Sequence, residues 1–518
     1  MHLIITKLTL ILYVLATLLL SPILSRNPCA GRPGETTVYC VCNQTYCDNV
    51  EPIVRPVAEA AGTALIYRSS QSGQRLDKSL LNFTDKPHGQ SPAIITIDSD
   101  KRYQTVLGIG AAFTDAATIN IQSLPKPMAS RLVSDYFDPE TGIGFSMGRI
   151  PIAGCDFSTH EYTYDDIADD YELREFALTK EDFDDKIPII KLAQTLSGHR
   201  LKLFASPWNT PHWLNDKKKI AQDPAKHYGT WANYFIKFLD AYKSYGINLW
   251  GLTIQNEPMS FSSMNFLNAS IERDFLKNYL GPALALSGYT PDKLHVLVYD
   301  DGSDRNPIVD YVDTCLSDKQ AAQYVSGIAY HCYLGSKWQK IPVLKERYPG
   351  MMFLMSECCQ NFRLDQKPEP KPSKLGKWEQ GADYAEQIVR TFNQDVNGWV
   401  EWNLALDTYG HPNKDHKAGD APVLINASNG EYYKNPNFYV LGHFSKFIEP
   451  QSVRIDAQLT KPLGSVGWVA FRRPDGSTTL VVYNNGNQSH DLAIYDHRLG
   501  YLSATLDEHS IQSYVYWH

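Results

Sequence analysis

The sequence has no surplus of positive charge and, beyond its first 25 residues, no long hydrophobic run. It carries 49 Lys and Arg residues against 57 Asp and Glu residues, a formal net charge of −8. This acidic balance argues against nucleic acid as a ligand. No later segment offers the ~20 consecutive apolar residues that a membrane-spanning helix requires, and no internal repeat stands out. What remains is a chain of 518 residues, 43% of them apolar, which is long enough for two or three packed domains.

The N-terminus predicts entry into the secretory pathway. Residues 1–25 contain one lysine and then the apolar run LTLILYVLATLLLSPIL, which is typical of a secretory signal peptide. A signal anchor is the alternative, because the small-residue cleavage signal near Ser25 is poor. Five N-x-S/T sequons follow and indicate a glycosylated luminal or secreted protein. They lie at Asn43, Asn82, Asn268, Asn426 and Asn487.

The nine cysteines divide unevenly along the chain. Four of them lie close together near the mature N-terminus, and an oxidising compartment would convert them into two disulfides. Three pairings are possible; we favour Cys29–Cys40 with Cys42–Cys47, because both close short loops. A zinc site is the alternative, but the spacing lacks the usual C-x2-C pairs. The other five are odd in number, so at least one is a free thiol: Cys155, Cys315, Cys332, Cys358 and Cys359.

Eight apolar runs with strand character alternate with segments of helical periodicity. The helical segments include residues 231–246 and 384–396, where apolar residues recur at i, i+3 and i+4. This α/β alternation over ~300 residues predicts a (β/α)8 TIM barrel within residues 105–451. The eight strands are expected at 105–115, 144–156, 201–209, 249–257, 294–301, 326–333, 351–357 and 398–403.

The two regions that flank the predicted barrel show a different sequence pattern. Residues 53–104 and 452–518 consist of short alternating segments with turn signals such as Pro474-Asp475-Gly476 and Asn484-Asn485-Gly486. We expect a hairpin array there, and one β-sandwich domain assembled from both flanks. Residues 27–51 are expected to form a separate, small, disulfide-bonded β segment.

Two glutamates lie at the C-terminal ends of expected strands, which is where a (β/α)8 barrel carries its active site. Glu257 ends the fourth strand and Glu357 ends the seventh. A glycosidase needs such a pair: one carboxylic acid protonates the leaving oxygen while the other carboxylate attacks the anomeric carbon, with ~5–5.5 Å between them for retention. We therefore expect an acidic optimum, with activity falling as the acid Glu257 ionises. The alternative is that both are solvated loop residues.

Other residues near the strand ends suit a sugar. Aromatic faces at Trp208, Tyr333 and Trp402 would stack on the C–H surfaces of a sugar ring. Hydroxyl groups could be held by Asp115, Asp156 and Asn256, and Arg149 could pin one of the carboxylates.

At this point the residues resemble a known family. "GCDF", "ASPW", "NEP", "SEC" and "EWNLAL" follow the second, third, fourth, seventh and eighth strands. Together with "CVCNQTYCD" and "NFYVLGHFSKFIEP", they resemble the lysosomal acid β-glucosidases, or glucosylceramidases, of glycoside hydrolase family 30. The likeness runs in order over the whole mature chain.

The resemblance implies a retaining β-glucosidase that acts on glucosylceramide in membranes, resides in lysosomes and uses no cofactor or metal. It implies Glu257 as general acid/base and Glu357 as nucleophile. An anionic lipid surface and a saposin-type activator protein are the helpers it implies. The remaining matched positions are Asp156, Trp208, Asn256, Tyr333 and Trp402 around the glucose, with Arg149, Asn403 and Cys359 as supporting residues.

Several positions depart from the family pattern. Cys332 stands where the family usually carries Trp, Cys358 where a small residue is usual, and Lys414 and Lys417 replace Trp and Asn at the pocket rim. These changes bear on the aglycone and on lipid contact more than on glucose. A metal site made of His331, Cys332, Cys358 and Cys359 is a further alternative.

Two other functions stay open on the sequence. A family 30 enzyme with another glycone, such as a xylanase or a 1,6-glucanase, would carry the same secretory signal. A carbohydrate-binding pseudo-enzyme is a third possibility, although both glutamates are present. Secretion instead of lysosomal residence also remains open.

Overall fold

The computed structural model describes residues 26–56, 62–89, 92–259, 267–302, 307–360, 372–414 and 418–518. The predicted signal peptide, residues 1–25, and Lys417 lie outside this part of the chain. Within the described ranges, no helix combines the length and the apolar character that crossing a bilayer needs.

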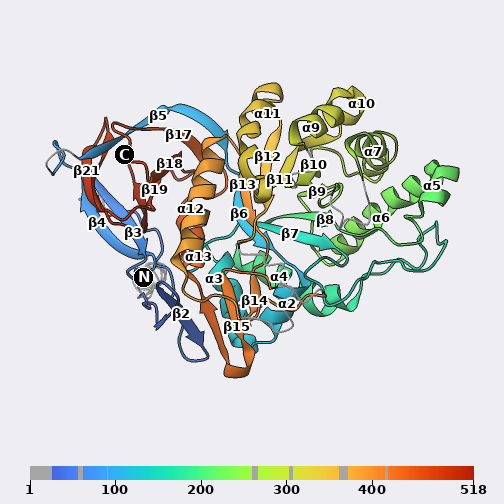
Figure 1. Cartoon of the computed structure of the whole chain (residues 1–518), viewed down its shortest axis with the longest axis horizontal. Helices are drawn as coiled ribbons and strands as arrows, with labels where there is room; N and C mark the ends of the chain where they lie inside the picture. Colours follow the sequence, from blue (N-terminus) through green and yellow to red (C-terminus); the bar gives the residue numbers. More distant parts are fainter. Residues whose placement is uncertain are drawn as a thin grey trace, which may run out of the picture.

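The centre of the molecule is a closed barrel of eight parallel strands (Figure 1), and each of the eight predicted strands is present. Its interior is filled by Met147, Phe204, Leu297, Ala329, Leu354 and Val400. Apolar runs buried on both faces are what a parallel sheet under a helical layer requires. The strands are β6 (Gly108–Ala112), β7 (Met147–Ile152), β8 (Lys202–Pro207), β9 (Gly251–Thr253), β10 (His295–Asp301), β11 (Val325–His331), β12 (Met352–Glu357) and β13 (Gly398–Glu401).

Helices surround the barrel, and polar side chains start several of them. Thr114 accepts from the backbone of Ala117 to cap α2, and Asn268 accepts from Ile271 to cap α7. The helices are α2 (Asp115–Gln122), α3 (Lys126–Phe137), α4 (Ile187–Leu196), α5 (Lys217–Gln222), α6 (Pro224–Ser244), α7 (Ala269–Phe275), α8 (Gly281–Leu286), α9 (Ile308–Ser317), α10 (Lys319–Ala322), α11 (Ile341–Arg347), α12 (Trp378–Asn393) and α13 (Pro436–Ser445). A 3-10 segment, η4 (Cys332–Lys340), follows β11, and π-helical turns precede α4 and α8.

Strands from both flanks form one nine-stranded sheet, as predicted for the sandwich. Its order is β21-β20-β5-β17-β18-β19-β22-β3-β4. The bridge between Thr84 and Tyr501 brings its two edges together, and α12 and α13 lie between this sheet and the barrel (Figure 1). The strands are β3 (Thr63–Ser70), β4 (Asp77–Asn82), β5 (Ala93–Thr105), β17 (Val453–Leu459), β18 (Val466–Arg472), β19 (Thr478–Asn484), β20 (His490–Asp496), β21 (Gly500–Leu506) and β22 (Ser510–Tyr516).

The expected hairpin array is right at one turn and wrong at the other. β18 and β19 pair antiparallel around the Pro474–Gly476 turn, where Gly476 has φ of 80°. β19 and β20 do not pair, because β19 lies between β18 and β22 while β20 lies between β21 and β5. Turn residues indicate where the chain reverses direction, but they do not determine which strand pairs with which.

The N-terminal segment does not form a separate β unit. Its strands β1 (Gly31–Pro33) and β2 (Val38–Asn43) join β14 (Ala405–Asp407), β15 (Val423–Asn426) and β16 (Glu431–Lys434) in one sheet, ordered β1-β2-β16-β15-β14. Chain from beyond the eighth barrel strand therefore supplies most of this sheet. The favoured disulfides, Cys29–Cys40 and Cys42–Cys47, are confirmed.

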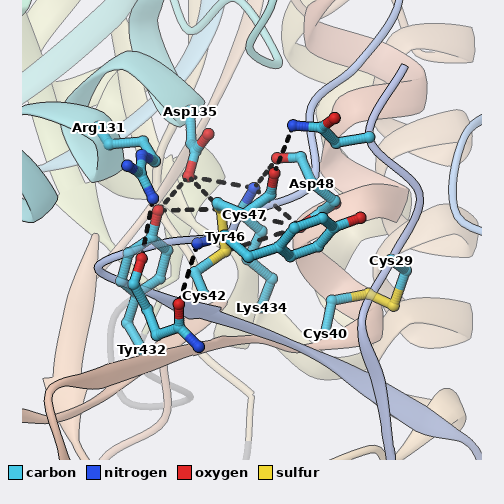
Figure 2. The surroundings of a disulfide bond; sticks show 12 residues. Cys29, Cys40, Cys42, Tyr46, Cys47, Asp48, Arg131, Asp135, Tyr432 and Lys434 are labelled. Atoms are coloured by element: carbon cyan, nitrogen blue, oxygen red, sulfur yellow. Dashed lines mark hydrogen bonds and ion pairs between the residues drawn. A yellow bond between two sulfur atoms is a disulfide. The ribbon is translucent and has the colours of Figure 1, made fainter. Parts of the chain in front are cut away.

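Buried ion pairs connect the N-terminal cystine segment to helix α3 of the barrel (Figure 2). The Lys434 ammonium lies 3.3 Å from Asp48 Oδ1 and 3.1 Å from Asp135 Oδ2, and so joins the cystine segment to α3. Tyr432 donates to the same Asp135 oxygen at 2.7 Å. Lone buried charges are costly, whereas this paired arrangement is satisfied.

A third disulfide, Cys332–Cys358, was not predicted, and it overturns the proposed metal set of His331, Cys332, Cys358 and Cys359. Two of the three sulfurs in that set are bonded to each other and are not available as thiolate ligands. The remaining cysteines, Cys155, Cys315 and Cys359, are free and buried, in line with the odd count.

Candidate active site

The two glutamates converge at the C-terminal mouth of the barrel. Glu357 is the last residue of β12, whereas β9 is shorter than expected and Glu257 lies in the turn beyond it. One carboxylate oxygen of each, together with a ring nitrogen of His331, lie within 4.8 Å of one another. This separation is close to the ~5–5.5 Å expected for a retaining glycosidase, and no water-wide gap of an inverting enzyme is left.

Backbone strain accompanies the placement of Glu257. Its φ is 44°, a left-handed conformation that few residues other than glycine adopt. Its N–H donates to the carbonyl of Asp300 at 3.0 Å, which fastens the turn to β10. The side chain is 27% exposed, so it borders solvent at the mouth.

Glu357 is held on both of its oxygens. Arg149 donates to Oε2, and the Tyr333 hydroxyl donates to Oε1 at 3.1 Å. Burial raises the pKa of Glu357, while the charges of His331 and Arg149 work in the opposite direction; the pKa remains raised. The group is therefore a fixed, desolvated carboxylate.

Arg149 organises the floor of the site from β7. It is fully buried and donates to Asn256 Oδ1 and to Asp300 Oδ2, both at 2.8 Å. A third bond, at 3.1 Å, runs to the Ser206 hydroxyl. The planar guanidinium thus links four barrel strands or their ends through charge-assisted bonds.

His331 carries the second positive charge of the site. Its Nδ1 lies 3.3 Å from Glu257 Oε1, and its Nε2 lies 3.3 Å from Asp300 Oδ1. Burial alone would lower its pKa, but the neighbouring carboxylates of Glu357, Asp300 and Glu257 outweigh that and raise the pKa to about 10. The imidazolium therefore offsets part of the negative charge between the two glutamates.

Asp300 is the permanently ionised member of the cluster. Despite its burial, the charge of Arg149 and the bonds from His331 and Ser356 hold its pKa well below the usual range. The Ser356 and Thr253 hydroxyls donate to its two oxygens at 2.5 Å and 2.6 Å. Asp300 fixes both cations that approach Glu357.

Aromatic rings line the same mouth. Trp208 and Trp402 stack with centroids 5.0 Å apart and planes 14° from parallel. The Arg149 guanidinium lies 4.8 Å from the Trp208 centroid and 5.4 Å from that of Trp402. Tyr333 is 38% exposed at the rim. The predicted aromatic residues therefore gather with the carboxylates.

Asp156 has an unsatisfied acceptor. Its Oδ1 is buried without a hydrogen-bond partner. Burial, and then the charges of Glu357 and Glu257, raise its pKa to about 7. A buried acceptor without a donor is costly, and a sugar hydroxyl would satisfy it. Asn256 accepts from Arg149 through Oδ1, which leaves its amide NH2 as a donor.

Comparison with family models identifies the family to which this barrel belongs. "Glycosyl hydrolase family 30 TIM-barrel domain" matches residues 106–448, and "Glycosyl hydrolase family 30 beta sandwich domain" matches residues 451–514. The chain belongs to glycosyl hydrolase family 30. It is accordingly a glycoside hydrolase, and its carboxylate pair lies where a barrel of this class carries its active site.

Relatives of this family 30 hydrolase cover nearly its whole length. The lysosomal acid glucosylceramidase of Mus musculus is 36% identical over 508 residues, covering 95% of this chain and 96% of the mouse protein. The crystal structure of SrfJ from Salmonella typhimurium matches with a TM-score of 0.78 at 25% identity, covering 88% of this chain and 100% of that one. An endo-β1,6-glucanase matches with a TM-score of 0.76, also at 25% identity and with the same coverage.

Three more predicted residues of the family 30 hydrolase follow barrel strands: Asp115 follows β6, Cys359 follows β12 and Asn403 follows β13. Asp115 accepts from Ser158 and Tyr162 at 2.6 Å and 2.9 Å. Its expected contact with sugar stays a prediction. Asn403 accepts from Thr114 at 2.8 Å and is fully buried. Burial, Glu401 and Asp420 raise the pKa of the Cys359 thiol, so this buried sulfur is a neutral packing group.

Asp300 and His331 are the site residues that sequence reasoning missed. Asp300 and His331 fall within the strands expected at 294–301 and 326–333, which are β10 and β11 in the structure. Neither was given a catalytic or positioning role, and His331 was considered only as a metal ligand. Their position at strand ends was the available signal. At the rim, Lys414 forms an ion pair with Glu161.

Proposed function

We propose that this family 30 hydrolase is a retaining β-glucosidase that releases glucose from glucosylceramide. The approach of Glu257 and Glu357 within 4.8 Å carries the proposal, because a double displacement needs that spacing. Similarity to the mouse glucosylceramidase over 95% of the chain supports the lipid substrate.

We assign Glu357 as the nucleophile and Glu257 as the acid/base. Arg149 and Tyr333 hold Glu357 as an oriented carboxylate, whereas Glu257 borders solvent, from which water must arrive. In the first step an oxygen of Glu357 attacks the anomeric carbon, and Glu257 gives its proton to the departing ceramide oxygen. In the second step Glu257 takes a proton from water, which attacks the same carbon and releases Glu357.

The glucose ring would sit among the polar and aromatic groups of the mouth. The buried oxygen of Asp156 accepts from a hydroxyl, and the amide of Asn256 donates to one. Trp208, Tyr333 and Trp402 supply apolar faces for the C–H surfaces of the sugar. His331 balances charge while the proton on Glu257 is transferred.

An apolar cavity of about 370 Å³ beside the mouth supports a lipid aglycone. Thr210, two residues after Trp208, forms part of its wall, and Ile220 reaches it from α5. Lys217 and Lys218 on α5 are exposed and face an anionic lipid surface in our proposal. The other apolar residues of its wall are Leu214, Ala221, Pro224, Tyr228, Trp231, Leu267 and Ile271.

We place the enzyme in the lysosome lumen, peripheral to the membrane. The apolar N-terminus and the lysosomal mouse relative support this location. The five sequon asparagines are each partly or fully exposed, as glycan attachment requires. A saposin-type activator protein is the partner that the family resemblance implies.

A 1,6-glucanase is the second candidate function, favoured by the structural match to an endo-β1,6-glucanase. The purified mature chain should be offered glucosylceramide in phosphatidylserine vesicles, soluble β-1,6-glucan and xylan, with Glu357→Gln as the inactive control. We expect turnover of the vesicles and none of either polysaccharide. Faster cleavage of glucan than of lipid would refute the ceramide assignment.

A further inference from the structure

The Cys332–Cys358 disulfide lies beside the proposed nucleophile and joins the ends of two neighbouring barrel strands. Cys332 directly follows β11, and Cys358 directly follows β12. The bond spans 26 residues of sequence and holds the two Cα atoms 5.1 Å apart. Both positions are departures from the family pattern noted in the sequence.

The crosslink is flanked by the groups that surround one oxygen of Glu357. Cys358 follows Glu357 itself, while Cys332 stands between His331 and Tyr333. The Tyr333 hydroxyl donates to Glu357 Oε1 at 3.1 Å, and His331 Nδ1 lies 3.7 Å from the same atom. The covalent bond therefore joins the backbone that carries the carboxylate to the backbone that carries both of these groups.

Strand pairing ends where the disulfide begins. The last pair between β11 and β12 is His331 with Glu357, after a register irregularity at Tyr330. Beyond it the chain turns into η4, and Tyr333 on the first turn is 38% exposed. A partly exposed tyrosine on an unpaired segment has rotational freedom to lose before it can hold a partner. The disulfide restrains the backbone at the adjacent residue.

We propose that Cys332–Cys358 is a positioning crosslink that holds the Tyr333 hydroxyl on Glu357 and so fixes the nucleophile for attack. The inference rests on the proposed role of Glu357 as nucleophile. The disulfide takes no part in bond making. It preorganises the hydrogen bond that orients the reacting carboxylate.

One further contact and the state of a neighbouring thiol fit this role. The Cys358 carbonyl accepts from the Trp402 N–H at 2.7 Å, so the crosslinked backbone also anchors one aromatic wall of the mouth. The adjacent thiol, Cys359, is buried and its pKa is raised well above the usual range, mainly by that burial. Only a thiolate attacks a disulfide efficiently, so Cys359 leaves the crosslink intact.

The test follows formation of the covalent intermediate with 2,4-dinitrophenyl 2-deoxy-2-fluoro-β-glucoside. Mass spectrometry of labelled wild type should find the sugar on Glu357. The double variant Cys332→Ser/Cys358→Ser should be labelled with a maximal rate constant ~10-fold lower, at an unchanged half-saturating concentration. A rate within twofold of wild type would overturn the positioning role. If wild type is not labelled on Glu357, the proposed function itself fails, and with it this inference.

A mutant cycle with Tyr333→Phe separates positioning from general stabilisation. If the disulfide acts through the tyrosine hydroxyl, the loss seen in Tyr333→Phe should not grow when both cysteines are also replaced. Multiplication of the two losses in the triple variant would contradict the coupling. Cys29→Ser/Cys40→Ser removes a disulfide far along the chain from the site and should keep the labelling rate constant of wild type.

A folding defect in the serine variant would not leave the question open. Folded wild type can instead be reduced with a phosphine, alkylated and mapped, and the labelling rate compared with the extent of Cys332–Cys358 reduction. We expect the slow-labelling fraction to equal the fraction reduced at this bond. A rate constant independent of that reduction would overturn the inference.

Discussion

Arg149, on β7, reaches the carboxylate of Glu357 at the end of β12 and holds its Oε2. The same guanidinium donates to Asp300 at 2.8 Å, and this second bond orients the Arg149 side chain toward Glu357. A hydrogen bond to a charged group contributes about 1.5–3 kcal/mol, equivalent to ~10–100-fold in rate.

Arg149→Lys should therefore lower kcat on an aryl β-glucoside by ~10–100-fold. Lysine keeps the charge but cannot fork between two carboxylates and an amide. Arg200→Lys is the matched control, because Arg200 pairs with Glu449 3.7 Å away and 44% of its side chain is exposed. Wild-type kcat in Arg149→Lys would show that the guanidinium fork does not orient the nucleophile.

Replacing each of the two glutamates should affect activity in a different way. Glu357→Gln should abolish turnover of every β-glucoside, since no glycosyl intermediate can form. Glu257→Ala should lose most ceramide-glucoside hydrolysis, because general acid catalysis contributes ~10²–10⁴-fold. It should still form the intermediate quickly from dinitrophenyl β-glucoside, whose leaving group needs no proton.

Azide distinguishes the roles by product analysis. Added azide should speed Glu257→Ala and give β-glucosyl azide, since two inversions retain the configuration. Rescue of Glu357→Ala with formation of the α-azide, together with an unresponsive Glu257→Ala, would reverse the assignment.

Activity should be confined to an acidic window. The nucleophile must be ionised, and burial raises the pKa of Glu357, so kcat/KM should fall on the acid side at a higher pH than an ordinary glutamate would give. On the alkaline side activity should fall as Glu257 loses the proton it must donate. A flat profile between pH 5 and 8 would be incompatible with this pair.

The pH profile of activity needs a control for Asp156. Burial raises the pKa of Asp156 to about 7, so its titration overlaps the range in which Glu257 is expected to lose its proton. The Asp156→Asn variant should bind glucose more weakly, seen as a higher KM, yet keep the alkaline limb of kcat. Disappearance of that limb in Asp156→Asn would assign it to Asp156 instead of Glu257.

Stability should also be greater at acidic pH. Burial raises the pKa of Asp135 to about 6 and that of Glu272 to about 7. The folded state therefore binds more protons than the unfolded chain between pH ~4 and ~7, and the stabilisation is lost as pH rises through the folded pKa values. Buried His443, with a pKa lowered to about 3, acts in the opposite direction.

Thermal unfolding of wild type should thus give a higher Tm at pH 5 than at pH 7.5. Glu272→Gln mimics the protonated acid, which accepts from the Tyr311 hydroxyl and the Tyr299 N–H. This variant should reduce the difference in Tm between the two pH values. An equal or larger difference in Glu272→Gln would show that another group controls the dependence.

Much of the architecture was readable from local pattern. The barrel strands are mostly apolar runs because both faces of a parallel sheet are covered, and polar residues such as Glu357 lie at or just beyond the ends of several of them. The short spacing of Cys29 to Cys40 and of Cys42 to Cys47 likewise made their pairing predictable. These features depend on neighbours in sequence.

Features that depend on distant residues were decided by the tertiary structure. The sequence determined the eight-stranded barrel, the two N-terminal disulfides and the candidate glutamates, since each is encoded in a short run. Only the fold put Asp300 and His331 behind that pair, set β20 beside β5, and brought Cys332 within bonding distance of Cys358. Strand register and the side-by-side placement of strand ends make these contacts, and neither is visible in spacing along the chain.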